Sequence, residues 1–235
     1  MRNLEDKSVI NAIMRQPSLV DYPGHLGVLM FTSGCNFRCG FCHNVDLIAD
    51  WHAKTFSFAI LKQRLEHYRE EWVKAVTVTG GEPTVHPGLP DTIAFFKEEG
   101  FLVKLDTNGS HPEMLKELLP LLDYVAMDVK CSLPRYQEFV HFGDTEKLRQ
   151  SIRLIMEGAK DYEFRTTLLE SFHTLPEIRE AARELQGAKR WIFQPFVPHD
   201  NLPQESLRTA TRTKPSFLQE CVEAAAPFVQ QATHR

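Results

Sequence analysis

Three cysteines crowd into one short segment of this chain. Cys35, Cys39 and Cys42 lie in the glycine-interrupted stretch "FTSGCNFRCGFCHN", and the whole sequence has only two others. Three thiolates presented by one loop form a soft, anionic ligand set that suits zinc or an iron–sulfur cluster. The spacing therefore predicts a metal centre at this loop.

A zinc site with His43 as the fourth ligand is one alternative, because three cysteines and one histidine form a legitimate tetrahedral set. Cys42 and His43 are adjacent, however, whereas zinc ligand pairs usually have two or more residues between them. A redox pair of Cys39 and Cys42 is another alternative, but it would leave Cys35 without a role. An iron–sulfur cluster uses all three thiols.

The elements that must position this loop follow from the hydrophobic pattern. Short, β-rich apolar runs alternate with segments of helical period, as in a parallel sheet whose strands are buried on both faces. The runs predict six strands, at 26–33, 75–81, 101–109, 124–130, 162–169 and 191–198. The segments between and after them predict helices at 56–72, 89–100, 112–122, 145–160, 175–187 and 215–232.

This alternation predicts a single α/β domain, an open partial (β/α)6 barrel similar to a TIM barrel, with parallel strands inside and helices outside. We expect an N-terminal extension at 1–24, the core at 25–200, and a C-terminal polar loop and helix at 201–235. In such sheets the ligand lies beyond the carboxyl ends of the strands. The loops there hold most of the unusual polar residues; they read "SGCNFRCGFCHN", "GGEP", "DTNG", "DVKC", "TTLLESFH" and "FVPHD".

Charge and hydropathy exclude some partners. A net charge of -4 without a basic cluster argues against a nucleic-acid binder. No apolar run approaches the roughly 18 residues of a membrane span, and the N-terminus lacks the apolar block of a secretory signal. We expect a cytoplasmic protein whose thiols stay reduced and which binds neither nucleic acid nor membrane.

The cysteine spacing, with Phe41 before the last cysteine, resembles the signature of radical S-adenosylmethionine (SAM) enzymes. The resemblance implies that Cys35, Cys39 and Cys42 bind three irons of a [4Fe-4S] cluster. The fourth iron is then chelated by the amino and carboxylate groups of SAM, and Phe41 lies against the adenine. An iron without a protein ligand leaves positions for a substrate, as in other catalytic metal sites.

Later motifs agree with that family in the expected order. In "TGGEP", Gly80 and Gly81 let the backbone approach the ligand, and Glu82 is expected to accept a bond from the amino group of SAM. "LDTNG" and "MDVK" resemble the corresponding loops of glycyl-radical-enzyme activases. These loops are expected to contact SAM through Asp106, Thr107, Asn108, Asp128 and Lys130.

Two of these residues create a charge problem. Asp106 and Asp128, next to the carboxylate of SAM, concentrate negative charge in a partly dry cavity, which is costly without counter-ions. Lys130 supplies one positive charge. The resemblance to activases suggests a second, a Na+ or K+ ion held by Asp106, Thr107 and Asp128. The alternative is that one aspartate caps a local turn.

Arg165 and Gln194 are further candidates for ligand contact, because side chains of the fifth and sixth strands face the core and the pocket alternately. Some activases carry a histidine after the proline of the sixth strand, where this chain has Val197. The remaining histidines, His43 included, are expected to be loop or surface residues.

The resemblance covers nearly the whole chain and implies a reaction under anaerobic conditions. The reduced cluster cleaves SAM to methionine and a 5'-deoxyadenosyl radical, which takes hydrogen from a substrate. The opening "PSLVDYPGHLGVLMFTSGCNFRCGFCHN" is similar to activases of anaerobic ribonucleotide reductase and of pyruvate formate-lyase. That similarity favours a glycine of a partner glycyl radical enzyme as substrate, with flavodoxin or ferredoxin as electron donor.

Two other functional classes stay open. A stand-alone radical SAM enzyme would act on a small molecule or peptide by epimerisation, cyclisation or rearrangement. A non-enzymatic metal-binding module would use the cysteines alone, but the intact later motifs argue against it. Cys131 and Cys221 are too few to ligate a second cluster by themselves.

Overall fold

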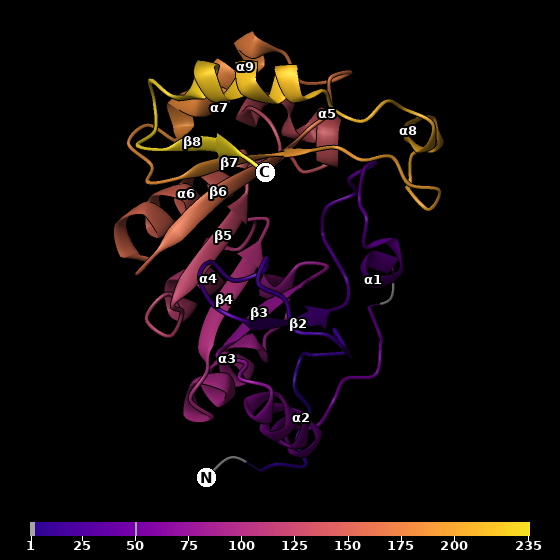
Figure 1. Cartoon of the computed structure of the whole chain (residues 1–235), viewed down its shortest axis with the longest axis vertical. Helices are drawn as coiled ribbons and strands as arrows, with labels where there is room; N and C mark the ends of the chain where they lie inside the picture. The colour runs from indigo at the N-terminus through magenta and orange to yellow at the C-terminus, as the bar shows by residue number, and fades with distance from the viewer. Residues whose placement is uncertain (1–2, 50) are drawn as a thin grey trace.

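The computed structural model describes residues 3–49 and 51–235. The strands form one sheet in sequence order, in which β1 pairs antiparallel with β2 and every later strand pairs parallel with the one before it (Figure 1). The first and last strands of that order do not pair with each other, so this sheet stays open. The strands are β1 Ala12–Ile13, β2 Gly27–Thr32, β3 Ala75–Gly80, β4 Leu102–Thr107, β5 Tyr124–Asp128, β6 Tyr162–Leu168, β7 Trp191–Pro195 and β8 Ala232–His234.

Helices cover the outer side of the curved sheet. Figure 1 shows α2, α3, α4, α6, α7 and α9 following its outer side, with the short α1 and α8 on the other side. Within the described part of the chain, no helix is long and apolar enough to cross a membrane. The helices are α1 Val45–Ala49, α2 Phe58–Glu70, η1 Pro83–Val85, α3 Leu89–Glu98, α4 Pro112–Leu118, η2 Leu133–Arg135, α5 Tyr136–Val140, α6 Thr145–Gly158, α7 Leu175–Glu184, α8 Glu205–Arg208 and α9 Pro215–Ala225.

The register of the sheet brings the carboxyl ends of the strands to one edge. Thr32 at the end of β2 is opposite Gly80 at the end of β3, and Thr107 at the end of β4 is opposite Met127 in β5. The central strands are largely buried, because helices pack on one face while the curved sheet encloses the other. Loops from successive strands therefore leave the sheet side by side.

The predicted α/β class and the open partial barrel are confirmed. The predicted number of strands is wrong, because the structure adds β1 within the N-terminal extension and β8 near the C-terminus. The predicted helix at 215–232 is also too long: α9 ends at Ala225, and β8 then pairs with β7. β8 spans three residues, too few to show a period, and it depends on hydrogen bonds to a distant strand. The expected polar loop after residue 202 contains the short helix α8.

Candidate active site

A cavity of about 420 Å³ lies at the carboxyl ends of the strands. Its walls come from the loops after β2, β3, β4 and β5 and from the ends of β6 and β7. All the site residues predicted from the sequence line this one cavity: Cys35, Cys39, Phe41, Cys42, Gly80, Gly81, Glu82, Asp106, Thr107, Asn108, Asp128, Lys130, Arg165 and Gln194.

The three cysteines of the loop after β2 are free thiols in a poorly solvated place. Cys35 is buried, and Cys39 and Cys42 are half-buried. Burial raises the pKa of Cys35 to about 11 and that of Cys39 to about 12, and it also raises the pKa of Cys42. Thiolates at these positions therefore require nearby positive charge, which bound metal supplies.

The backbone around the cysteine loop forms a cradle that only glycine permits. Gly34 has a φ of +77° and Gly80 a φ of +122°. A Cβ added to Gly81 would lie 1.9 Å from the carbonyl oxygen of Gly34, and one added to Gly80 would lie 2.2 Å from that of Thr32. The β2 and β3 loops are thus in direct backbone contact beside the thiols.

The three thiols of this loop suit an iron–sulfur cluster. Among residues 3–49 and 51–235, no three His, Cys, Asp or Glu side chains are gathered around one metal position. The Nε2 atom of His43 is 3.1 Å from the carbonyl oxygen of Val197, a contact that occupies one of its two ring nitrogens. In a cubane each thiolate binds a separate iron, which agrees with three cysteines spread along one loop.

Glu82 joins the second and third loops through a buried carboxylate. Its Oε1 accepts hydrogen bonds from the Thr84 backbone N–H at 3.1 Å, from the Thr84 hydroxyl and from the Thr107 hydroxyl at 2.7 Å. Its Oε2 accepts from the Asn108 N–H at 2.6 Å. Burial raises the pKa of Glu82, although these four donors oppose the rise. The residue both lines the cavity and fixes the loop after β4.

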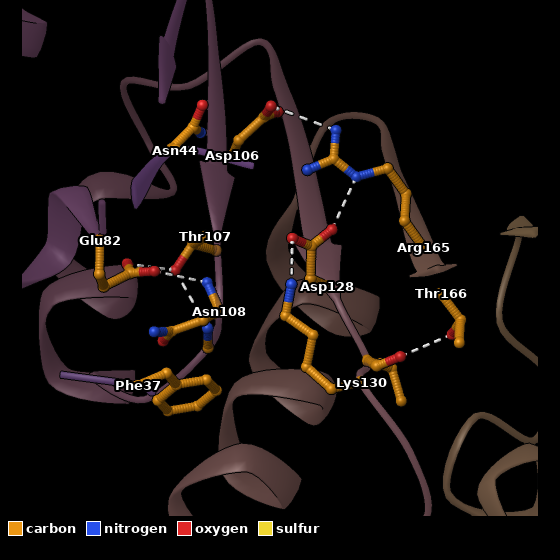
Figure 2. A network of polar contacts seen from close by, with 12 residues as sticks. Phe37, Asn44, Glu82, Asp106, Thr107, Asn108, Asp128, Lys130, Arg165 and Thr166 are labelled. Carbon is orange, nitrogen blue, oxygen red and sulfur yellow. Dashed lines mark hydrogen bonds and ion pairs between the residues drawn. The ribbon is translucent and has the colours of Figure 1, made fainter. Parts of the chain in front are cut away.

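Alternating charges run along the wall formed by β4, β5 and β6 (Figure 2). Arg165 donates to Asp106 at 3.1 Å and to Asp128 at 2.9 Å, and Lys130 donates to Asp128 at 2.8 Å. Lys104, almost fully buried, lies 3.2 Å from the other oxygen of Asp106. Burial alone would raise the pKa of Asp128, but the charges of Arg165 and Lys130 outweigh it and hold the pKa well below its usual range.

Comparison with known proteins identifies the family of this site. The sequence pattern of the radical SAM superfamily matches residues 29–185. This chain belongs to the radical SAM superfamily. A relative from Methanocaldococcus jannaschii, MJ1227, is 30% identical over 97% of this chain and 96% of its own length, and is provisionally named as a glycyl-radical enzyme activating enzyme.

Two further proteins are similar to this chain, one in sequence and one in fold. The 7-carboxy-7-deazaguanine synthase of Thermococcus kodakarensis is 28% identical over 74% of this chain and 76% of its own length. The structure of Streptococcus suis SuiB bound to S-adenosylmethionine superposes with a TM-score of 0.68 at 12% identity, over 86% of this chain. This chain spans about half of SuiB, 48% of its length, and the likeness concerns the fold.

The three residues predicted to bind a monovalent cation contact other protein side chains in this structure. The carboxylates of Asp106 and Asp128 converge on Arg165, whereas the hydroxyl of Thr107 points to Glu82 (Figure 2). The positive charge sought from Na+ or K+ is thus already present in Arg165, with Lys130 beside it. The cation stays a prediction.

Phe41 and Asn108, two of the residues predicted to contact SAM, also contact other protein side chains. Phe41 is buried, stacks on Phe139 with ring centroids 4.8 Å apart, and has the Lys130 Nζ 5.8 Å from its own centroid. The side chain of Asn108 donates to the Asn36 side chain at 3.0 Å, which ties it to the cysteine loop. The adenine role of Phe41 and the ligand contacts of Asn108 stay predictions.

Some cavity residues were missed by the sequence argument. Thr167 lines the cavity two positions after Arg165, and strand alternation from Arg165 would have found it. Asn44 also lines it, and its side chain donates to the Gly80 carbonyl at 3.3 Å, a contact that no local pattern announces. His173 lies in a loop as expected but is 1% exposed, so it is not a surface residue.

Proposed function

We propose that this radical SAM enzyme is an activase that takes a hydrogen atom from a glycine of a partner glycyl radical enzyme. The observation that carries the proposal is the similarity to MJ1227 over almost the full length of both chains, since that protein is named for this activity. The "LDTNG" and "MDVK" loops, which resemble those of activases, lie at the same cavity and support it.

The residues have separate tasks in this proposal. Cys35, Cys39 and Cys42 would hold a [4Fe-4S] cluster through their thiolates, and the remaining cavity would take SAM. When bound, the reduced cluster supplies the electron that cleaves SAM and so generates the hydrogen-abstracting species. Lys130 and Arg165 offset the carboxylate charge in the cavity wall.

Partner, electron donor and compartment complete the proposal. We assign a glycyl radical enzyme such as anaerobic ribonucleotide reductase as partner and flavodoxin or ferredoxin as donor, in an anaerobic cytoplasm. Na+ or K+ at Asp106, Thr107 and Asp128 would have to compete with Arg165, so replacing both ions with a large organic cation is the direct test of that ion. Unchanged SAM affinity would remove the ion from the proposal.

The activase function is tested by electron paramagnetic resonance. Reconstituted, reduced protein is mixed with SAM and a glycyl radical enzyme encoded near it, and the expected signal is a glycine-centred doublet. A Cys39→Ala variant and a partner whose radical glycine is replaced by alanine should both give no doublet. Methionine and 5'-deoxyadenosine without a doublet, for all such partners, would contradict the activase function while leaving the superfamily chemistry intact.

A second function is favoured by the similarity to the T. kodakarensis 7-carboxy-7-deazaguanine synthase, which covers about three quarters of both chains. A stand-alone enzyme of that type would use the same cluster on a small molecule. Deuterium transfer from a labelled metabolite pool into 5'-deoxyadenosine, in the absence of any partner protein, would favour this function over the activase.

A further inference from the structure

The loop that carries Lys130 is held by buried polar residues to which no sequence motif assigned a role. Tyr136 and His173 are 0% and 1% exposed, and they belong to α5 and to the loop after β6. Buried polar groups are costly unless they are paired. Their partners therefore indicate what they hold.

Both residues bond the backbone of Lys130. The N–H of Lys130 donates to the hydroxyl oxygen of Tyr136 at 2.8 Å. The Nε2 of His173 lies 2.9 Å from the carbonyl oxygen of Lys130. The Nδ1 of His173 lies 3.0 Å from the Leu169 N–H and 3.3 Å from the Leu169 carbonyl oxygen; because the N–H can only donate and makes the shorter contact, we assign Nδ1 as the acceptor and the proton to Nε2. His173 is thus a neutral donor to Lys130.

The preceding residue is fixed in the same way. The N–H of Val129 donates to the Arg165 carbonyl at 2.8 Å, and the carbonyl of Val129 accepts from the Thr166 hydroxyl at 2.6 Å. All four backbone polar groups of Val129 and Lys130 are therefore bonded just after β5 ends. Three of the four bonds come from side chains, so the conformation of this loop depends on those side chains as well as on the neighbouring strand β6.

The fixed backbone determines where the ammonium of Lys130 lies. Its Nζ bonds Asp128 at 2.8 Å and lies 5.8 Å from the centroid of Phe41, which stands between Gly40 and Cys42 (Figure 2 shows the Lys130–Asp128 contact). The positive charge therefore faces the loop that carries the three thiols. A small rotation of the Lys130 backbone would move a long side chain away from that loop.

We propose that Tyr136 and His173 are positioning residues that hold Lys130 toward the cysteine loop and the SAM site. The inference uses the superfamily chemistry and is independent of the identity of the partner protein. His173 also packs edge-on against Phe139 and Phe172, each with ring centroids 5.3 Å away, and Phe139 stacks on Phe41. The His173 side chain thereby contacts both the Lys130 backbone and the aromatic rings that stack on Phe41.

The test uses Tyr136→Phe and His173→Leu, with Tyr162→Phe as the matched control. The hydroxyl of Tyr162 also accepts a backbone N–H, from Lys189 at 3.0 Å, but at the amino end of β6. His173→Gln is the conservative variant, since an amide keeps one donor and one acceptor. All four variants keep the cysteines and Lys130.

The first readout needs no cofactor. Hydrogen–deuterium exchange of the peptide spanning residues 127–133 should become about tenfold faster in Tyr136→Phe and His173→Leu, as expected when a buried hydrogen bond is lost. Exchange there should stay at the wild-type rate in Tyr162→Phe and return toward it in His173→Gln. Equal acceleration in Tyr162→Phe would overturn the inference, because the effect would then be global.

The second readout is binding of SAM to the anaerobically reconstituted protein, by equilibrium dialysis and by the change SAM causes in the resonance spectrum of the reduced cluster. At equal iron content, affinity should fall about fivefold to tenfold in Tyr136→Phe and His173→Leu, and hardly change in the control and in His173→Gln. Wild-type affinity and spectra in a variant whose loop exchanges faster would also overturn the inference. Failure of the glycyl radical assay would leave both readouts unaffected.

Discussion

The two ends of the curved sheet are built from the same strands but differ in what covers them. At the amino end, Lys104 donates to the carbonyl of Asp21 at 2.7 Å, and the Tyr124 hydroxyl donates to the buried Glu163 at 2.9 Å. Tyr22 packs against Tyr124 with ring centroids 6.0 Å apart. At the carboxyl end the strands open into the cavity of about 420 Å³. One end is closed by protein groups, and the other keeps thiols and charges available.

The difference shows how one end supports the other. Lys104, Asp106, Arg165, Asp128 and Lys130 form a continuous series of ion pairs from the closed end to the cavity. Each charge in this series has a partner of opposite sign, and Arg165 and Lys130 hold the pKa of Asp128 well below its usual range. Lys104, which bonds Asp21 at the closed end, thus also pairs with a carboxylate of the cavity wall.

The largest expected effect on the open end is a loss of metal affinity in Cys42→Ala, with Cys221→Ala as its control. Changes in groups around metal ligands already cost about 10- to 100-fold in metal affinity, so losing a ligand should cost about 100-fold or more. Cys221 is a buried thiol in α9, away from the cavity lining. Iron and sulfide are measured after anaerobic reconstitution and gel filtration. Equal iron content in the two variants would remove Cys42 from the cluster.

The next largest effect is expected from Arg165→Met. Removing this guanidinium leaves Asp106 and Asp128 without their shared partner, which should lower the free energy of unfolding by about 3–5 kcal/mol. The control is Arg149→Met, whose arginine pairs with Glu146 and Glu184 on the surface.

The control should cost under about 1 kcal/mol, because exposed ion pairs contribute little. Urea unfolding of the cluster-free protein measures both variants. If Arg165→Met costs no more than Arg149→Met, the buried series of ion pairs does not stabilise the open end.

A smaller effect is expected from Gly81→Ala. Its new Cβ would meet the backbone oxygen of Gly34, which cannot move without shifting the cysteine loop, so a loss of about 1–3 kcal/mol and of cluster retention should follow. Gly158→Ala is the control, since its Cβ would meet only the end of the Leu119 side chain at 3.3 Å. Thermal unfolding and iron content check both variants. Normal cluster loading in a stable Gly81→Ala protein would mean that the contact between the two loops is dispensable.

Local patterns in the sequence were sufficient for the parallel core and for most of the cavity. Buried strands such as β3 (AVTVTG) and β5 (YVAMD) are short runs rich in β-branched and apolar residues, and each ends at the residues that carry the chemistry. A parallel sheet brings those ends together wherever the strands are correctly found, so Cys35, Glu82 and Asp106 could be assigned to one cavity without any knowledge of their contacts.

Contacts between distant segments could not be predicted. Arg165 was expected to touch ligand, but nothing local indicates that it also bridges Asp106 and Asp128 from the neighbouring strands. Tyr136 and His173 sit in segments without a motif, and their role depends on a loop that lies beside them only after folding. β8 depends in the same way on β7.

The smallest expected effect concerns the pH dependence of stability at the open end. Burial lowers the pKa of His173 below its usual 6.5, and the groups facing the ring are the Lys130 carbonyl, the Leu169 backbone, Glu177 and Arg135. Near pH 6.5 His173 therefore binds a proton in the unfolded chain but not in the native protein. The free energy of unfolding should therefore fall as pH drops below about 6.5, by at most about 1.4 kcal/mol per pH unit from this residue, and be unaffected by it above that pH.

His173→Gln has no titrating ring, so its unfolding free energy should vary less between pH 7 and pH 5 than that of the wild type. His67→Gln removes a histidine whose side chain is 60% exposed and serves as the control for replacing a histidine outside the buried loop. Urea titrations at half-unit pH intervals in cluster-free protein measure the three slopes. If His173→Gln keeps the wild-type slope, the ring is not held neutral against the Lys130 carbonyl, and the tautomer on which the positioning of that loop depends is wrong.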